Sequence, residues 1–305
     1  MIRTTQLTRR YGDLVAVDRL DLAVPQGAIF GFIGPNGAGK TTTINILATL
    51  LRPSSGRAWI DGIDIQADPR EVRRRVGYMP ESFGLYEDML VWEYLDFFAA
   101  AYEVPARRRP GIVDDVLALT DLAPLRDRPL DSLSRGMRQR LCLAKTLVHD
   151  PKVLLLDEPA SGLDPRGRIE LRELLRTLAG MGKTILVSSH ILSDLSSYCS
   201  HIGILEGGRL LAAGPVEEVL ASVRAHRRIV LRCLREAGRA ETLLAAASGV
   251  RNVVRDGNTL HFEFIGTDEE LALLPPRLVE AAIPFHGLTE RDLDLEEIFL
   301  ELTTV

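Results

Sequence analysis

The chain has 305 residues and a formal charge of −5, from 37 Lys and Arg against 42 Asp and Glu. Hydrophobic residues make up 46% and charged residues 26%, which is typical of a folded protein and excludes disordered or collagen-like chains. No apolar stretch approaches the roughly 18 residues of a membrane-spanning helix, the N-terminus lacks a signal core, and a net acidic chain has no general attraction to nucleic acid.

The first part of the chain alternates short strand patterns with turns over residues 1–30. The apolar run Ala28–Ile33 then predicts a buried strand, and a helical pattern over Thr41–Leu51 ends before Pro53. The segment between them is rich in glycine. Strand, glycine loop and helix in this order are the setting that a phosphate-binding loop requires.

Residues 88–148 have apolar residues at helical spacing and are predicted to be mostly helical. Two continuous apolar runs follow, Val153–Leu156 and Thr184–Val187, with a helical pattern over Ile169–Leu178 between them. Buried strands that alternate with helices predict an α/β fold with a parallel sheet covered on both faces.

The pattern changes after residue 215. Strand and helix patterns then follow in the order β-α-β-β-α-β, with a hairpin signal at 256–258 and a last helix over Leu293–Leu302. This order fits a split βαβ module, which includes the ferredoxin-like fold. We therefore expect one domain over 1–220, with a helical subdomain at about 82–148, and a small α+β domain over 221–305.

A complete GxxxxGK[ST] pattern occupies residues 34–41. Its glycines allow backbone N–H groups to surround an anion, and the following helix directs the positive end of its dipole at the same place. Lys40 is expected to contact the β- and γ-phosphates, and Thr41 to offer its hydroxyl to Mg²⁺. The predicted nucleotide-binding residues here are Gly34, Pro35, Asn36, Gly37, Ala38, Gly39, Lys40, Thr41 and Thr42.

Two acidic residues follow the buried run Val153–Leu156. Asp157 ends the predicted strand, where a carboxylate needs a cation, and Mg²⁺ is the natural partner. Glu158 is placed to polarise the water that attacks the γ-phosphate.

Three more segments complete an ordered set. Residues 133–137 (LSRGM) open a helical run whose start leaves N–H groups and the Ser134 hydroxyl free for an anion. Residues 161–165 (SGLDP) follow Glu158 closely, and His190 ends the predicted strand TILVSSH.

The whole set, over about residues 1–215, resembles the ATP-binding-cassette (ABC) ATPases. In that family the Walker A motif corresponds to 34–41, Walker B to 153–158, the signature to 133–137 and the D-loop to 161–165. The resemblance implies that Tyr11 stacks on adenine and that His190 braces the γ-phosphate and the attacking water. It also implies a head-to-tail dimer that holds two ATPs, each reached by the signature and D-loop residues Ser134, Gly136 and Asp164.

Two positions depart from the family pattern. Arg135 stands at a signature glycine, where it either adds a cation beside the nucleotide or is a solvated side chain. Glu81 stands where the family carries glutamine, so its carboxylate either serves Mg²⁺ and the attacking water or slows turnover by repelling the phosphates.

Two segments bear on the partners. Residues 78–102 contain eight of the 17 aromatic residues and form either a subdomain core or a groove that grips a partner helix, which in the family is a permease coupling helix. Residues 294–303 resemble the ending of antibiotic-resistance and gliding-motility transport ATPases that carry a C-terminal domain. The alternative for this tail is an ordinary amphipathic helix.

The leading hypothesis is a cytoplasmic ATPase subunit, peripheral on the inner face of the membrane, that drives export through a separate transmembrane permease. One alternative is a nucleotide-gated interaction module with little hydrolysis. Another is a soluble cassette ATPase of DNA repair or translation. Repair members carry a long coiled coil between Walker A and the signature, but only about ninety residues separate these motifs here, without sustained heptads.

Overall fold

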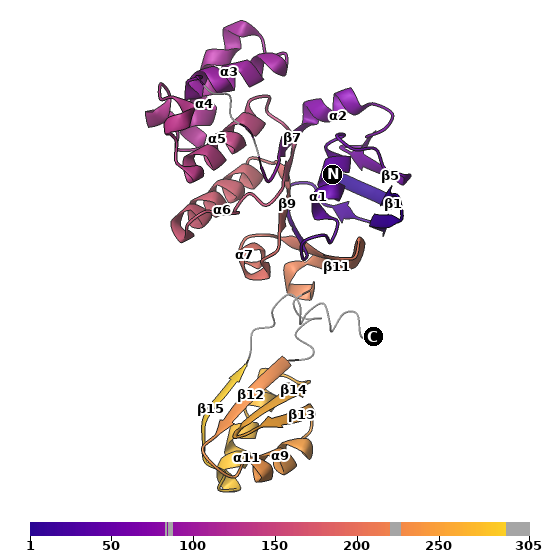
Figure 1. Ribbon diagram of the computed structural model, residues 1–305, viewed down its shortest axis with the longest axis vertical. Helices are drawn as coiled ribbons and strands as arrows, with labels where there is room; N and C mark the ends of the chain where they lie inside the picture. The colour runs from indigo at the N-terminus through magenta and orange to yellow at the C-terminus, as the bar shows by residue number, and fades with distance from the viewer. Residues whose placement is uncertain (83, 85–87, 220–226, 291–305) are drawn as a thin grey trace. The chain divides into compact units, whose positions relative to one another are not determined.

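The computed structural model describes residues 1–82, 84, 88–219 and 227–290 (Figure 1). The chain divides into two compact units, Met1–Val216 and Glu217–Val305. Within the described ranges, each helix is too short or too polar to cross a membrane.

A six-stranded sheet forms the centre of the first unit, in the order β11-β10-β4-β9-β8-β7. Neighbours from β10 to β7 are parallel, and β11 pairs antiparallel with β10. The strands are β4 (Ile29–Ile33), β7 (Val76–Met79), β8 (Val153–Leu156), β9 (Thr184–Ser189), β10 (His201–Glu206) and β11 (Arg209–Pro215). Every residue of β4, β8 and β9 is buried, as expected for parallel strands covered on both faces.

A second, antiparallel sheet is built mainly from the N-terminal residues, in the order β2-β1-β5-β6, with β3 paired to β1. Its strands are β1 (Ile2–Tyr11), β2 (Leu14–Leu20), β3 (Ala23–Val24), β5 (Ser55–Ile60) and β6 (Ile63–Asp64). Helix α1 (Lys40–Leu47) shares one apolar core with both sheets. The predicted helix 41–51 is too long at its end, because Thr49 adopts a left-handed φ of 63° that ends the helix.

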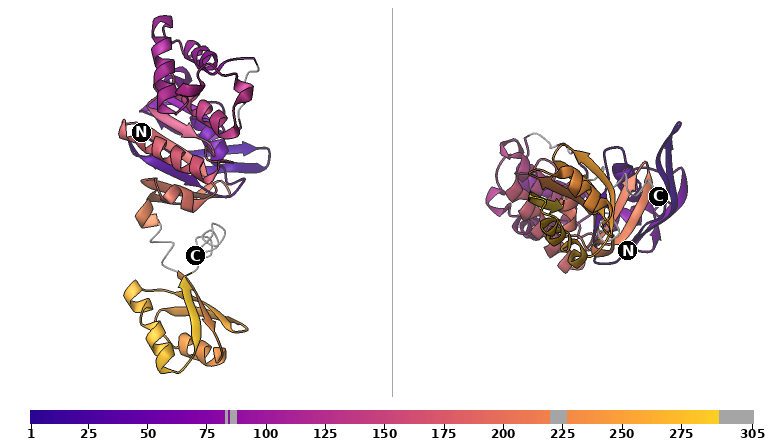
Figure 2. Two further views of the ribbon diagram at one scale, coloured as in Figure 1. Left: turned by 90° about the vertical axis from the view of Figure 1, so that its left-hand side faces the viewer. Right: turned by 90° about the horizontal axis from the view of Figure 1, so that it is seen from below.

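Helices lie on both faces of the central sheet. In Figure 1 the sheet separates α1 from α5 (Arg135–Leu147) and α6 (Pro165–Gly180), and in the left view of Figure 2 the pink α6 lies in front of the strands. The short helices α2 (Pro69–Arg75) and α7 (Leu192–Ser196) complete this cover. The predicted α/β arrangement is confirmed.

A helical group contains α3 (Val91–Ala101) and α4 (Arg109–Leu119), which pack on each other and on α5. Three 3₁₀ turns, Ala106–Arg108, Ala123–Leu125 and Leu130–Ser132, connect the helices. Of the aromatic tract, Tyr94 is buried and meets Phe98 edge-on, whereas Phe97 is 47% exposed. The tract therefore supplies both core and surface; Phe83 and Tyr86 lie outside the described residues.

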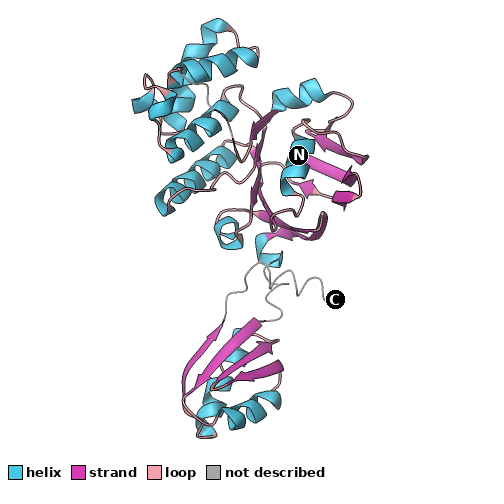
Figure 3. Cartoon of the chain, viewed as in Figure 1, coloured by secondary structure: helices cyan, strands magenta, loops and turns pink. Residues whose placement is uncertain are grey.

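The second unit contains a four-stranded antiparallel sheet in the order β13-β14-β12-β15, which is the split βαβ order of a ferredoxin-like fold. Figure 3 shows its helices gathered on one face of the sheet. Pro275 and Pro276 lie in the first turn of α11, where a helix needs no N–H donor. The expected last helix and the tail at 294–303 lie outside the described residues. The elements are β12 (Arg227–Cys233), α9 (Ala237–Ala245), β13 (Val250–Asp256), β14 (Thr259–Phe264), α10 (Asp268–Leu271), α11 (Leu274–Glu280) and β15 (Phe285–Glu290).

Candidate functional site

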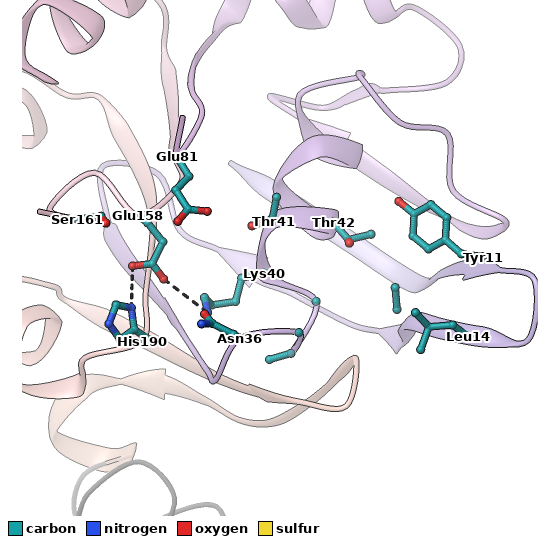
Figure 4. Close-up of a pocket in the computed structure, with 14 residues that line it drawn as sticks. Tyr11, Leu14, Asn36, Lys40, Thr41, Thr42, Glu81, Glu158, Ser161 and His190 are labelled. Atoms are coloured by element: carbon teal, nitrogen blue, oxygen red, sulfur yellow. Dashed lines mark hydrogen bonds and ion pairs between the residues drawn. The ribbon is translucent and has the colours of Figure 1, made fainter. Parts of the chain in front are cut away.

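A cavity of about 320 Å³ opens where β4, β7, β8 and β9 end, at the edge where α1 begins. Figure 4 shows the Lys40, Glu81, Glu158 and His190 side chains directed into it, with Tyr11 at the other end. The structure thus brings most of the sequence-predicted residues together. The lining residues are Tyr11, Leu14, Ala16, Asn36, Gly37, Ala38, Gly39, Lys40, Thr41, Thr42, Glu81, Glu158, Ser161 and His190.

The glycine loop between β4 and α1 is confined by backbone from distant strands. A Cβ on Gly34 would lie 2.5 Å from the Leu205 carbonyl oxygen, and one on Gly39 would lie 2.5 Å from that of Ala16. Gly39 also has a φ of 102°, which a residue with a side chain rarely adopts. Glycine is therefore required at both positions for the loop to close over an anion.

Lys40 is nearly buried, and its ammonium lies at the centre of the loop. The Nζ atom donates to the carbonyl oxygens of Gly34 at 2.6 Å and Pro35 at 3.2 Å, and it lies 3.5 Å from Glu158 Oε1. Phosphate oxygens make stronger, charge-assisted hydrogen bonds than neutral carbonyls do. The ammonium is therefore placed to exchange its carbonyl partners for a phosphate.

Asp157 and Glu158 are held by one serine on the neighbouring strand β9. The Ser188 hydroxyl donates to Asp157 Oδ1 at 2.6 Å and accepts from the Glu158 backbone N–H at 2.8 Å. Asp157 is fully buried, and its Oδ2 atom has no hydrogen-bond partner among the described residues. An orphaned buried carboxylate oxygen calls for a cation or a cation-bound water, so the donor set fits Mg²⁺.

The two carboxylate oxygens of Glu158 have different surroundings. Its Oε2 lies 3.0 Å from His190 Nδ1, whereas Oε1 accepts no hydrogen bond within the described part of the chain. The residue has a left-handed φ of 47°, so the chain turns sharply after β8 and directs the side chain into the cavity (Figure 4). Oε1 lies 3.5 Å from the Lys40 ammonium, and it can accept a proton from a water when that ammonium contacts a phosphate.

Tyr78 lies on β7, near Asp157. Burial raises its pKa to about 12, and the nearby negative charge of Asp157 acts in the same direction. The phenol therefore stays protonated at neutral pH and donates to Asn45 Oδ1 at 2.9 Å. This bond joins β7 to α1.

Of the signature and D-loop residues, Ser161 lines this cavity, but Ser134, Gly136 and Asp164 do not. Ser134, Gly136 and Asp164 line a second cavity of about 400 Å³ between α5 and α6. Ser134 accepts from the Met137 N–H and Asp164 from the Gly167 N–H, so the two side chains cap α5 and α6. Within one subunit they therefore do not contact the residues around Lys40.

Sequence reasoning missed several residues of the first cavity. Leu14 and Ala16 come from β2, whose approach to the loop depends on the fold of the antiparallel sheet. Ser188, which supports both carboxylates, has a visible signal: it is a polar residue within an apolar strand, two positions before His190.

Comparison with known proteins decides the family. Residues 17–161 match the ABC transporter family. The daunorubicin resistance ATP-binding protein DrrA3 of Streptomyces coeruleorubidus is 38% identical over 297 residues, which cover 97% of this chain and 93% of that protein. The chain belongs to the ATP-binding subunits of ABC transporters.

Two further proteins resemble this ABC ATPase. The bacitracin transport ATP-binding protein BcrA of Bacillus licheniformis is 34% identical over 305 residues, covering 99% of this chain and 97% of that protein. A bacterial ABC transporter cassette, MJ0796, solved as a dimer, has a TM-score of 0.65 and 25% identity and covers 71% of this chain and 99% of that chain. The predicted family and P-loop cassette fold are therefore confirmed, and the subunit is an ATPase.

Proposed function

We propose that this ABC ATPase works as a head-to-tail pair that hydrolyses Mg²⁺-bound ATP and drives export through a separate membrane permease. The observation that carries the proposal is the convergence of Lys40, Glu158 and His190 in one cavity over the buried Asp157. Export is inferred from the relatives, whose names refer to daunorubicin resistance and bacitracin transport.

Each side chain has a role that its contacts support. The loop 34–42 surrounds the phosphates with N–H groups, and Lys40 binds their negative charge. Asp157 and Thr41 hold Mg²⁺, which neutralises charge on the phosphates. Glu158 accepts the proton of the attacking water through Oε1, which accepts no hydrogen bond from the described residues and lies 3.5 Å from the Lys40 ammonium. His190 orients Glu158 and braces the γ-phosphate. Glu81 faces the same cavity and serves Mg²⁺ or the attacking water.

The pair follows from the position of the second cavity. Ser134, Gly136 and Asp164 do not line the cavity of their own subunit, so we infer that they reach the γ-phosphate bound by the other subunit. A second subunit would cover the open side of the nucleotide and exclude water. The dimeric form of the MJ0796 cassette supports this arrangement.

One experiment tests both the permease partner and the association of the subunit with the membrane. We expect tagged subunit solubilised from native membranes to co-purify with a transmembrane protein, and reconstitution of both to give ATP-dependent transport. The exposed Phe97 in α3 is a candidate contact with the permease. Recovery of ribosomes or DNA without any membrane protein would contradict the proposal and favour a soluble cassette ATPase.

Hydrolysis should depend on Mg²⁺ through Asp157. Chelation of divalent cations is expected to abolish hydrolysis, and Asp157→Asn should raise the Mg²⁺ concentration for half-maximal activity at least about tenfold, because a charged ligand is lost. Asp150→Asn alters an exposed carboxylate and is the matched control. An Asp157→Asn enzyme with an unchanged Mg²⁺ titration would remove Asp157 from the metal site.

The ring of Tyr11, on which we propose that adenine stacks, makes a cation–π contact with Arg9. The Arg9 guanidinium lies 4.6 Å from the centre of the Tyr11 ring, and its Nη1 donates to the Arg52 carbonyl at 2.9 Å. Because an exposed cation–π contact contributes about 0.5–1 kcal/mol, Arg9→Ala should raise the Kd for ATP about two- to fivefold. Titration with a fluorescent ATP analogue measures this change. Arg10→Ala is the control, and equal affinities for both variants would show that Tyr11 needs no support.

A further inference from the structure

Arg135 contacts the D-loop of its own subunit. Its guanidinium packs directly on Gly162. A Cβ on residue 162 would overlap the guanidinium. Its Nη2 lies 3.5 Å from the carbonyl oxygen of Ser161. Gly162 has a left-handed φ of 71°, and its lack of a Cβ makes room for the guanidinium. The next residues also meet, because Leu163 lies beside Gly136.

The loop that Arg135 covers continues directly from the catalytic carboxylate. The Ser161 N–H donates to the Glu158 carbonyl at 3.0 Å, and the Leu163 N–H donates to that of Ala160 at 3.2 Å. Ser161 also lines the nucleotide cavity. The turn from 158 to 163 is thus fixed by Ser188 where it begins and covered by Arg135 where it ends.

We propose that Arg135 is a positioning residue that joins the start of α5 to the D-loop of the same subunit and so holds Glu158 in its hydrolytic position. This inference rests on the proposed function, because it gives Arg135 a role in that hydrolysis. It differs from the two interpretations that the sequence left open. Arg135 is exposed, but its guanidinium lies against Gly162 instead of in open solvent, and the role we assign to it is in its own subunit instead of at the partner's nucleotide.

The contact between Arg135 and Gly162 is tested by a double-mutant cycle. Arg135→Ala should lower kcat about three- to tenfold with an unchanged Kd for ATP. Arg135→Lys should restore part of the loss, because its chain and charge still cover Gly162, although it ends one bond short of the Nη2 that lies 3.5 Å from the Ser161 carbonyl. Gly162→Ala should displace the guanidinium and lower kcat similarly. The double variant should be no slower than Gly162→Ala alone. Additive losses would overturn the contact as the cause.

Two controls separate this role from general damage. Gly182→Ala places alanine at a φ of 87° with open space around it, so it reports the backbone strain alone. Arg138→Ala removes another α5 arginine, one that donates to the carbonyls of Asp131 and Leu133. Both controls should keep the wild-type kcat. A loss equal to that of Arg135→Ala in either control would overturn a specific role for Arg135.

Mixed dimers determine which subunit Arg135 serves. In a dimer of one Arg135→Ala subunit and one Glu158→Gln subunit, the single working site uses the Glu158 and D-loop of the Arg135→Ala subunit, so it should be slow. When both changes are placed in one subunit beside a wild-type partner, the working site keeps its own Arg135 and should be normal. The reverse result would assign Arg135 to the partner's nucleotide and contradict the proposal. A wild-type enzyme without ATPase activity would instead contradict the proposed function itself.

Discussion

Replacing Glu158 with glutamine is expected to lower kcat for ATP hydrolysis by about 10²–10⁴-fold while leaving ATP binding intact. The amide keeps the shape of the side chain and a hydrogen-bonding group near His190, but it cannot accept the proton of the attacking water. Phosphate release under steady-state conditions measures the loss, and a fluorescent ATP analogue measures binding.

The control for this variant is Glu173→Gln, which changes an exposed carboxylate on α6. Its rate should equal that of the wild type. A Glu158→Gln enzyme that retained full turnover would remove Glu158 from the role of general base.

Replacing Lys40 with methionine should have the second large effect, on binding. A charge-assisted hydrogen bond contributes about 1.5–3 kcal/mol, so the Kd for ATP should rise about ten- to more than a hundredfold. Methionine has similar length but no charge, and the Gly34 and Pro35 carbonyls would lose their donor. Equilibrium titration with ATP measures the change.

Lys152→Met, at an exposed lysine paired with Asp61, is the matched control and should bind ATP normally. Thermal unfolding of both variants without nucleotide separates lost contacts to phosphate from a damaged loop. If Lys40→Met bound ATP as tightly as the wild type and folded equally well, the loop 34–42 would not be the phosphate site.

The sequence predicts the parts of the site that chemistry and local spacing dictate. The glycine loop, Lys40, Asp157 and Glu158 follow from a strand, a tight turn and a helix within short segments, so their residue types are visible without a fold. The parallel sheet follows for the same reason, since its buried strands are continuous apolar runs.

Contacts between distant segments could not be predicted in this way. Ala16 confines Gly39 only because the antiparallel sheet packs against the loop, and no local pattern marks it. The sequence marks Arg135 as a departure from the family pattern, but its contact with Gly162 depends on how α5 and the D-loop are arranged.

The shared ATP site is tested most directly by the mass of Glu158→Gln in solution, measured by light scattering with and without Mg²⁺ and ATP. One chain has a mass of 33.7 kDa, and we expect saturating nucleotide to double this value, with two ATPs bound per dimer. The dimer should dissociate when Mg²⁺ and nucleotide are removed. A particle that stays at the mass of a single chain under saturating nucleotide would contradict an ATP site shared by two subunits.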